Sequence, residues 1–334
     1  GCFIYVCCRC FIFVYKQQLN NTNTAGSRLR EVMRFSISDA KTALRDPYFL
    51  LRELNSFVYR HGYRWEYNKR GVDIFAQDWD NLIILDACRY DAFRDHAAPE
   101  LPGHLETRTS RAAATPEFIR GNFSNRELHE VVYVTGSSWI YKLGDEVDCE
   151  LHAVIDAKND FDYDQSYQIE QVRTAAEAYP NKRLLIHFIP PHHPFQGPLA
   201  EKHLPPIEEQ SSGFFDRLRR GETDVDRATL WQIYLENLDR IVPRVNALLS
   251  ELRGKTVVSA DHGELFGERC GAIPIRAWGH PIGFYADPLV TVPWHVHENG
   301  ERKDIVPEAP EDDHIDPRPA AEIDQHLRDL GYKV

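Results

Sequence analysis

An aspartate and a histidine stand side by side at the point where a short apolar run ends. The run Val257–Ala260 is rich in β-branched residues and predicts a buried strand, and Asp261, His262 and Gly263 follow it directly. In an open α/β sheet, ligands bind beyond the carboxyl ends of the strands. A carboxylate and an imidazole at such an end are suitable ligands for a divalent metal. The same residues would also suit an ordinary polar turn, so the rest of the chain must decide.

A second carboxylate ends another apolar run. The stretch Asn81–Asp86 reads Asn-Leu-Ile-Ile-Leu-Asp, and the four apolar residues before the acid predict a buried parallel strand with a carboxylate at its tip. Asp86 could equally cap the helix that we expect after it, because aspartate is favoured at helix N-termini. The pattern alone leaves both interpretations open.

A threonine and a pair of histidines complete the set of residues that could take part in catalysis. Thr115 precedes Pro116, which predicts a helix with Thr115 as its cap and Pro116 at its first position. A hydroxyl at a helix N-terminus faces the positive end of the helix dipole, which favours a nucleophile that meets an anion. His192 and His193 lie between prolines after an expected strand over Arg183–Ile189, so they are either ligand contacts or exposed loop residues.

Alternating strands and helices must position these residues. Apolar residues at helical spacing predict two helices in Arg28–Arg60, with Asp46 as the cap of the second. They also predict a long amphipathic helix over Asp226–Leu252 and a closing helix over Ala320–Leu330. Between residues 80 and 295, expected strands alternate with helices. This pattern predicts an α/β fold, a doubly wound and mostly parallel sheet with helices on both faces.

We divide the chain into four parts: an atypical tip and linker over 1–27, a helical arm over 28–78, a catalytic α/β domain over 79–299, and an acidic linker with a C-terminal helix over 300–334. The first fifteen residues are apolar and rich in cysteine, but too short to span a bilayer comfortably. They are either a membrane-associated or acylated tip or no part of the native protein, and they are left out of the fold prediction. The acidic, proline-rich residues 300–318 are expected to be mobile.

The composition narrows the class of protein. The chain has 334 residues, 43% of them hydrophobic, which is enough for a sizeable core, and its net charge of -12 repels nucleic acid. Arginine far outnumbers lysine, which suits a salt-adapted protein. The cysteines form no disulfide framework, and no clear transmembrane segment is present, so we expect a cytoplasmic protein. An anionic substrate would have to be held by local cations or a metal against the overall charge.

In a doubly wound sheet these strand ends and helix starts converge on one edge. Asp86, Asp261 and His262 would then suit a divalent ion, which could lower the pKa of the Thr115 hydroxyl and attract a substrate oxyanion. His280 lies beyond them in the chain. The reaction class that fits this set is the hydrolysis or transfer of a phosphate or sulfate ester.

The order and context of the motifs resemble the sulfatase-like branch of the alkaline phosphatase superfamily over about residues 80–332. The Asp-x-x-Arg-x-Asp pattern that begins at Asp86 is similar to the first metal-binding strand of some phosphodiesterases and phosphoethanolamine transferases in that group. The other stretches that carry the resemblance are Pro191–Phe195, Ser259–Glu264, Val292–Trp294 and Leu330–Tyr332, of which Ser259–Glu264 is the most specific.

This resemblance implies a fold like that of the superfamily and a role for each candidate residue. It assigns the metal ligands, in chain order, as Asp86, Thr115, Asp261 and His262. It assigns catalysis to Thr115 as the nucleophile, with His192 and Arg89, and substrate binding to His193 and His280. The cofactor is expected to be a divalent metal, namely Mn, Zn, Ca or Mg. One site is expected firmly, and a second is left open because no Asp-x-x-x-His partner for His280 is found.

Two differences between this sequence and the sulfatase pattern favour some reactions of the superfamily over others. No cysteine lies near Thr115, so a formylglycine mechanism is not expected, and Ala87 stands where many sulfatases have a second aspartate. We therefore expect a metal-dependent hydrolase, such as a phosphodiesterase, that cleaves a phosphate or sulfate ester through a threonine nucleophile. One alternative is a phosphoethanolamine- or phosphoglycerol-type transferase acting on a glycan or lipid. Another is a catalytically silent member that binds a glycan or lipid headgroup.

Overall fold

The structure, a computed structural model, describes residues 46–158, 165–210, 213–310 and 319–332. The predicted tip and the first predicted helix lie outside the described residues. Contacts divide the chain into Gly1–Leu50 and Leu51–Val334, and the second unit contains all the candidate site residues. The four predicted domain boundaries stay predictions. Within the described residues, no helix combines the length and the apolar character needed to cross a membrane.

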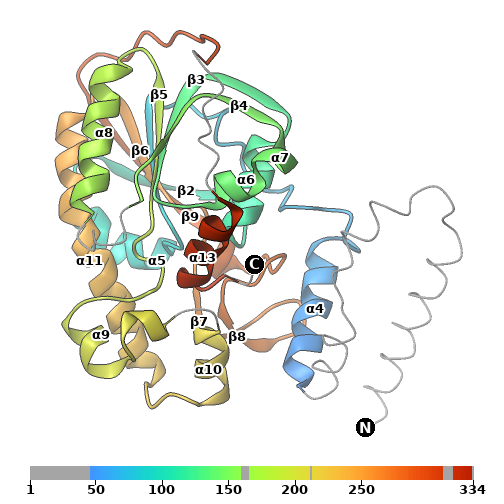
Figure 1. Cartoon of the computed structure of the whole chain (residues 1–334). Helices are drawn as coiled ribbons and strands as arrows, with labels where there is room; N and C mark the ends of the chain where they lie inside the picture. Colours follow the sequence, from blue (N-terminus) through green and yellow to red (C-terminus); the bar gives the residue numbers. More distant parts are fainter. Residues whose placement is uncertain (1–45, 159–164, 211–212, 311–318, 333–334) are drawn as a thin grey trace, which may run out of the picture. The chain divides into compact units, whose positions relative to one another are not determined.

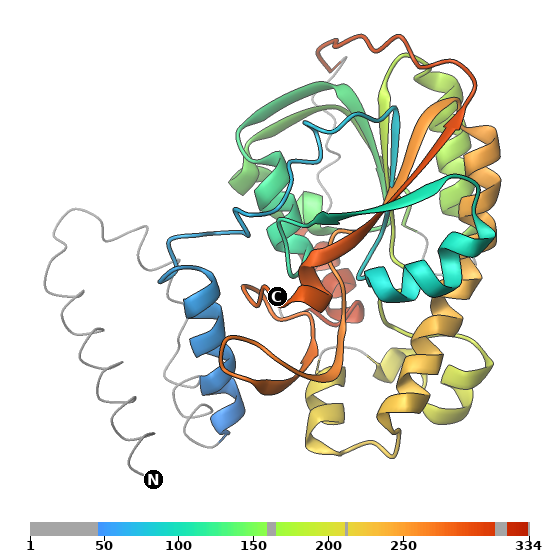
Figure 2. The same ribbon diagram turned by 180° about the vertical axis from the view of Figure 1, so that it is seen from behind.

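A seven-stranded sheet forms the centre of the second unit, in the order β2-β9-β6-β1-β5-β3-β4 (Figure 1). Parallel pairing joins β6, β1, β5, β3 and β4, whereas β9 pairs antiparallel with both β6 and β2. Figure 2 shows β9 and β2 side by side along that edge from behind. The strands are β1 Asn81–Leu85, β2 His104–Thr109, β3 Arg126–Thr135, β4 Cys149–Asp156, β5 Arg183–Phe188, β6 Gly254–Ser259 and β9 Thr291–Asn299.

Hydrophobic side chains cover both faces of this sheet, which confirms the predicted doubly wound fold. Ile83 and Leu85 of β1 pack into one apolar cluster, and Leu82 and Ile84 pack into another. This alternation follows from the two-residue period of a strand, and it explains why β1 is apolar throughout. The first cluster includes residues of α8 (Ser166–Ala178) and α11 (Arg227–Glu251), and the second includes residues of α6 (Thr115–Phe123), α7 (Trp139–Val147) and α13 (Ala320–Asp329).

Several smaller elements complete the fold. The predicted second N-terminal helix is present as α4, and the backbone N–H of Tyr48 donates to the predicted cap Asp46 at 3.1 Å. The other short elements are α5 Tyr90–Ala92, η1 Phe93–Ala97, η2 Ala98–Glu100, α9 Pro198–His203, η3 Ile207–Glu209, α10 Phe214–Arg220 and α12 Asp287–Val290, together with a second sheet of β7 Leu265–Cys270 and β8 Ile275–Gly279. The helix α4 itself spans Pro47–Tyr59.

The segment after β9 differs from its prediction. Residues 300–310 were expected to be mobile, but their backbone bonds to the rest of the domain: Val306 N–H donates to Asn181 and Glu308 N–H donates to His129. The buried Lys182 ammonium adds an ion pair to Glu308 at 3.0 Å. A composition rich in acid and proline therefore does not make this part of the segment mobile, because its carbonyls and acids find partners on the sheet.

Candidate active site

Strand pairing brings the two aspartates together. Ile84 of β1 lies opposite Ser259 of β6 in parallel register, so the chain leaves both strands at the same edge, two residues before Asp86 and Asp261. The backbone N–H of Ala87 then donates to Asp261 Oδ1 at 3.1 Å. Both carboxylates are fully buried. The predicted convergence of these strand ends is therefore present in the structure, and Asp86 caps no helix.

Thr115 is placed by the start of α6, but it is not the cap that the sequence predicted. The cap position belongs to Ala114, and Thr115 is the first helical residue. The reason is that Glu117 satisfies the backbone here, since its Oε2 accepts from the N–H of Ala113 at 3.0 Å. The hydroxyl of Thr115 is thus free to point into the site rather than back to its own helix.

The Thr115 hydroxyl lies among the three other predicted metal ligands. Its Oγ1 is 2.9 Å from Asp261 Oδ2, 3.4 Å from Asp86 Oδ2 and 3.3 Å from His262 Nε2. One ligand atom each from Asp86, Asp261 and His262 lies within 4.8 Å of the others. All of these side chains are buried. The structure therefore brings together the whole predicted metal set.

The chemistry of this set fits a divalent cation. His262 Nδ1 is 2.8 Å from the carbonyl of Gly263, which can only accept, so Nδ1 carries the proton and Nε2 presents a lone pair. That lone pair faces Asp261 Oδ2 at 3.3 Å and Asp86 Oδ1 at 3.5 Å. Asp86 Oδ1 is buried and has no hydrogen-bond partner among the described residues. Three facing lone pairs repel one another unless a cation lies between them.

Burial favours the neutral form of both Asp86 and His262, although it shifts their pKa values in opposite directions. Burial, and then the neighbouring Asp261 carboxylate, raise the pKa of Asp86 well above its ordinary value. Burial lowers the pKa of His262 below its ordinary value, so the imidazole is held neutral, as a metal ligand must be. Without a cation, Asp86 would hold a proton that a metal ion would displace.

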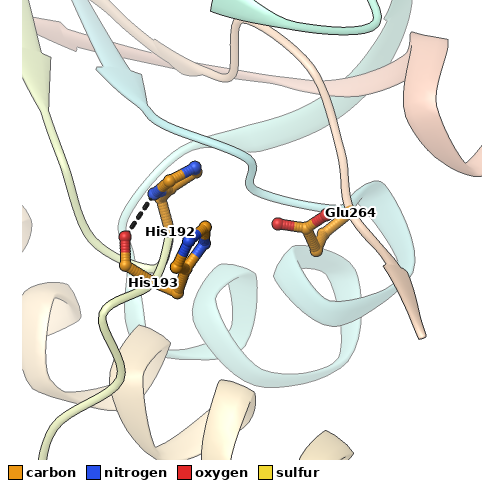
Figure 3. A group of neighbouring side chains, drawn as sticks. All are labelled: His192, His193 and Glu264. Carbon is orange, nitrogen blue, oxygen red and sulfur yellow. Dashed lines mark hydrogen bonds between the residues drawn. The ribbon is translucent and has the colours of Figure 1, made fainter. Parts of the chain in front are cut away.

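A second group of possible metal ligands consists of His192, His193 and Glu264, with one ligand atom of each within 4.8 Å of the others. Figure 3 shows the two imidazoles close together, with the Glu264 carboxylate facing them. His192 Nδ1 bonds to the carbonyl of His193, so its Nε2 presents a lone pair, which is buried without a partner among the described residues. The chain thus offers ligands for the second metal that the sequence left open.

His280 joins the two groups. Its Nδ1 is 3.1 Å from both carboxylate oxygens of Glu264, and its ring centroid is 4.8 Å from that of His262 and 4.9 Å from that of His192. Burial alone would lower the pKa of His280, but the adjacent Glu264 carboxylate raises it above its ordinary value. Glu264 thus favours the protonated form of His280, and the predicted role of His280 in substrate binding stays a prediction.

The two remaining predicted site residues, Arg89 and His193, are held in place by neighbouring side chains. The Arg89 guanidinium bonds to both oxygens of Asp91 at 2.6 and 2.8 Å and to Glu268 at 2.6 Å, and it also donates to the carbonyl of Glu264. The ring of His193 packs against Phe214 and Phe215. The Arg89 guanidinium thus bonds to two acids and to the backbone of the Asp-His-Gly-Glu motif. Its predicted catalytic role stays a prediction.

Three residues of the site were not singled out from the sequence. Glu264 was known only as the last residue of the Asp-His-Gly-Glu motif. His187 is the last residue but one of β5, with its Nε2 3.8 Å from Asp86 and 3.9 Å from Asp261. Tyr332 contacts Thr115 Oγ1 through its hydroxyl at 2.9 Å. The sequence offered a signal for Glu264 and for Tyr332, since each ends a stretch that carries the family resemblance, whereas only the fold could reveal the position of His187.

Among known proteins, only solved structures were found to be similar to this chain. No protein-family model matches the chain, and no curated protein matches it. The soluble domain of lipooligosaccharide phosphoethanolamine transferase A from Neisseria meningitidis is similar with a TM-score of 0.39 and 13% identity, covering 66% of this chain and 78% of that one. The C-terminal periplasmic domain of EcEptC from Escherichia coli, in complex with Zn, gives a TM-score of 0.38 and 11% identity over 67% of this chain and 75% of that one.

The integral membrane form of the Neisseria meningitidis transferase is matched with a TM-score of 0.37 and 15% identity, over 66% of this chain. The match spans 48% of that protein, so this chain corresponds to about half of its length.

Proposed function

We propose that this chain is a metal-dependent enzyme that moves the phosphoryl part of a phosphate ester to an acceptor by way of a covalent ester on Thr115. The observation that carries the proposal is the position of Thr115 Oγ1, which lies within 3.4 Å of Asp86, Asp261 and His262 at the edge of the sheet. A hydroxyl so placed is an activated nucleophile beside a cation site.

Asp86, Asp261, His262 and the Thr115 oxygen would hold the divalent metal, which supplies positive charge to a transition state rich in oxygen charge. The second ligand group, His192, His193 and Glu264, suits a further cation or the substrate oxygens. His280 adds a positively charged donor, because Glu264 favours its protonated form. Placed charges of this kind are the main catalytic resource for phosphoryl transfer.

In the first step, Thr115 Oγ1 forms a bond to phosphorus while the bond from phosphorus to the leaving alcohol breaks. A cation held by these residues would lower the pKa of the Thr115 hydroxyl, whose proton leaves to the medium. The leaving oxygen takes the electron pair and acquires a proton from the medium. In the second step an acceptor hydroxyl attacks the same phosphorus and loses its proton to the medium, and Thr115 Oγ1 leaves with the electron pair and takes up a proton.

Of the two reactions that the sequence left open, we propose transfer to an acceptor hydroxyl rather than hydrolysis. The supporting observation is burial: Thr115 is 0% exposed and is surrounded by side chains that are themselves buried. A site that excludes bulk water protects a covalent intermediate from hydrolysis until an acceptor binds. A glycan or lipid headgroup with a free hydroxyl is the class of acceptor that we propose.

The test is turnover of bis-p-nitrophenyl phosphate, p-nitrophenyl phosphate and p-nitrophenyl sulfate by protein stripped of metal and reloaded with manganese, zinc, calcium or magnesium. We expect metal-dependent release of p-nitrophenol from a phosphate ester, accelerated by an added alcohol such as glycerol. Thr115→Ala should abolish it, whereas Thr107→Ala, on the exposed face of β2, should not. Release that glycerol does not accelerate would identify a hydrolase, and full activity in Thr115→Ala would exclude the mechanism.

A further inference from the structure

One hydrogen-bond partner of the proposed nucleophile belongs to the C-terminal turn. Tyr332 follows α13, and its hydroxyl lies 2.9 Å from Thr115 Oγ1, although 217 positions separate the two residues in the chain. The Tyr332 ring stacks on His192, with ring centroids 5.5 Å apart and an interplanar angle of 11°. Neither the metal ligands nor the substrate-binding residues described above include this phenol.

The hydrogen bond between the two hydroxyls has a defined direction. Thr115 has one hydroxyl proton, and Asp261 Oδ2, at 2.9 Å, is the acceptor that takes it. Toward Tyr332, the threonine oxygen can therefore only accept. The tyrosine O–H donates to it, and no other hydrogen-bond partner of that phenol is known among the described residues.

Several contacts hold the phenol in this position. Gly331 has a φ of +85°, and a Cβ there would come within 2.1 Å of His193 Nε2, so glycine is required for the turn that carries the chain to Tyr332. The backbone N–H of Tyr332 donates to Leu327, which is fully buried in the core. The ring of Trp139 packs edge-on against the phenol at 5.0 Å between centroids. A donor so constrained loses little entropy when it acts.

We propose that Tyr332 is the hydrogen-bond donor that stabilises the Thr115 oxygen as the leaving group in the second half of the reaction. The inference rests on the proposed function. In that step the acceptor oxygen bonds to phosphorus, the bond from phosphorus to Oγ1 breaks, and Oγ1 takes the electron pair. Oγ1 then takes up a proton from the medium, and the acceptor releases its own proton to the medium. The phenol keeps its proton throughout and donates to the charge that develops on Oγ1.

The role predicts an asymmetry between the two steps. When Thr115 attacks, a donor on Oγ1 stabilises the free nucleophile at least as much as the transition state, so it does not speed the step. When Oγ1 leaves, negative charge grows on it, and the same donor then lowers the barrier. Removing the phenol oxygen should therefore slow the release of the covalent intermediate and leave its formation almost unchanged.

The experiment compares Tyr332→Phe with the unaltered chain on bis-p-nitrophenyl phosphate in the presence of metal and glycerol. Phenylalanine keeps the ring that stacks on His192 and removes the donor. We expect an initial burst of about one p-nitrophenol per enzyme, a steady rate lowered about 10-fold, and a covalent adduct on Thr115 that mass spectrometry detects in the variant. Tyr63→Phe, which removes a half-buried hydroxyl near Glu53, is the matched control and should show neither burst nor adduct.

Each other outcome overturns the inference in a recognisable way. An unchanged rate without adduct would show that the phenol contributes nothing, and a higher rate would show that Tyr332 covers the nucleophile instead of assisting it. If Tyr332→Phe unfolds at a lower temperature, a chain that ends at Leu330 must reproduce the burst and the adduct for the proposal to stand. Loss of activity in Thr115→Ala without any effect of Tyr332→Phe would leave the proposed function intact. A wild-type chain without turnover would overturn both.

Discussion

His280 Nδ1 lies 3.1 Å from each of the two carboxylate oxygens of Glu264. Glu264 also belongs to the group of possible metal ligands that includes His192 and His193. One buried carboxylate thus serves two purposes, because it keeps a proton on His280 and offers an oxygen to a cation. This double role makes Glu264 the most informative position for separating the two ligand groups.

Glu264→Gln keeps the size of the side chain and removes its charge. We expect the metal content of the purified protein to fall by about one ion and activity to fall at least about 100-fold, because a ligand and the partner of His280 are lost together. Elemental analysis and turnover measure the two effects. Glu298→Gln, an exposed change on β9, is the control. Unchanged metal content with lost activity would restrict Glu264 to holding His280.

Asp86→Asn should have opposite effects on the metal-free and the metal-loaded protein. In the metal-free chain, burial and then the nearby Asp261 carboxylate raise the pKa of Asp86, so folding at neutral pH must protonate this acid. A neutral amide removes that cost and should raise the free energy of unfolding by about 1 kcal/mol. With metal present, the variant should lose most of the stabilisation that the ion gives the unaltered protein. Thermal unfolding with and without zinc tests this, and a less stable metal-free variant would contradict it.

Arg89→Lys tests whether this residue acts on the substrate or on the structure. A lysine cannot reproduce the paired bonds to Asp91 and the bond to Glu268, so we expect a loss of about 2 kcal/mol in the free energy of unfolding. Activity should fall less than about 10-fold, since the guanidinium is engaged by these acids. Urea unfolding and kcat/KM are the measurements. A loss of activity above 100-fold at unchanged stability would restore the catalytic role expected from the sequence.

The lowered pKa of Lys303 predicts that the free energy of unfolding rises at alkaline pH. Its ammonium donates to Asn81 and to the carbonyl of Lys182, and burial lowers its pKa to about 8. Between about pH 8 and the ordinary lysine value, the unfolded chain binds a proton that the folded chain does not, so the free energy of unfolding increases with pH in that window. We expect a gain of about 1 kcal/mol, reduced by partial exposure of the side chain.

Urea unfolding of the wild type and Lys303→Met at pH 7.5, 9 and 10 isolates this contribution from those of other groups. The difference between the two proteins should change with pH in favour of the wild type. A difference that stays constant would show that Lys303 has an ordinary pKa in the folded chain.

The centre of the sheet and the meeting of Asp86, Asp261 and His262 could be predicted from the sequence, because they depend on local pattern. Residues Leu82–Leu85 and Val257–Val258 are apolar because both faces of their strands are buried, and the two aspartates follow the ends of these strands. Strand β2 escaped prediction because five of its six residues, the exception being its second, are polar or charged, as suits an edge strand. Thr115 is the first helical residue instead of the predicted cap, because Glu117 accepts the hydrogen bond from the backbone before the helix. No short motif reveals this contact.

Contacts between distant parts of the chain could not be predicted in this way. The phenol of Tyr332 meets Thr115 only because α13 packs against the same face of the sheet as α6 and α7. His187 reaches the two aspartates because β5 is the neighbour of β1. Each of these encounters is set by strand order and helix packing, which depend on the whole fold rather than on neighbouring residues.

The buried pair of Asp86 and Asp261 has a consequence for the life of the protein in a cell. A chain that carries facing acids in its interior opens more often when no ion neutralises them, and opened chains are the ones that proteases degrade. The abundance of this protein would then follow the supply of its metal. A cell starved of the ion would lose the enzyme itself as well as its activity, without any change in transcription.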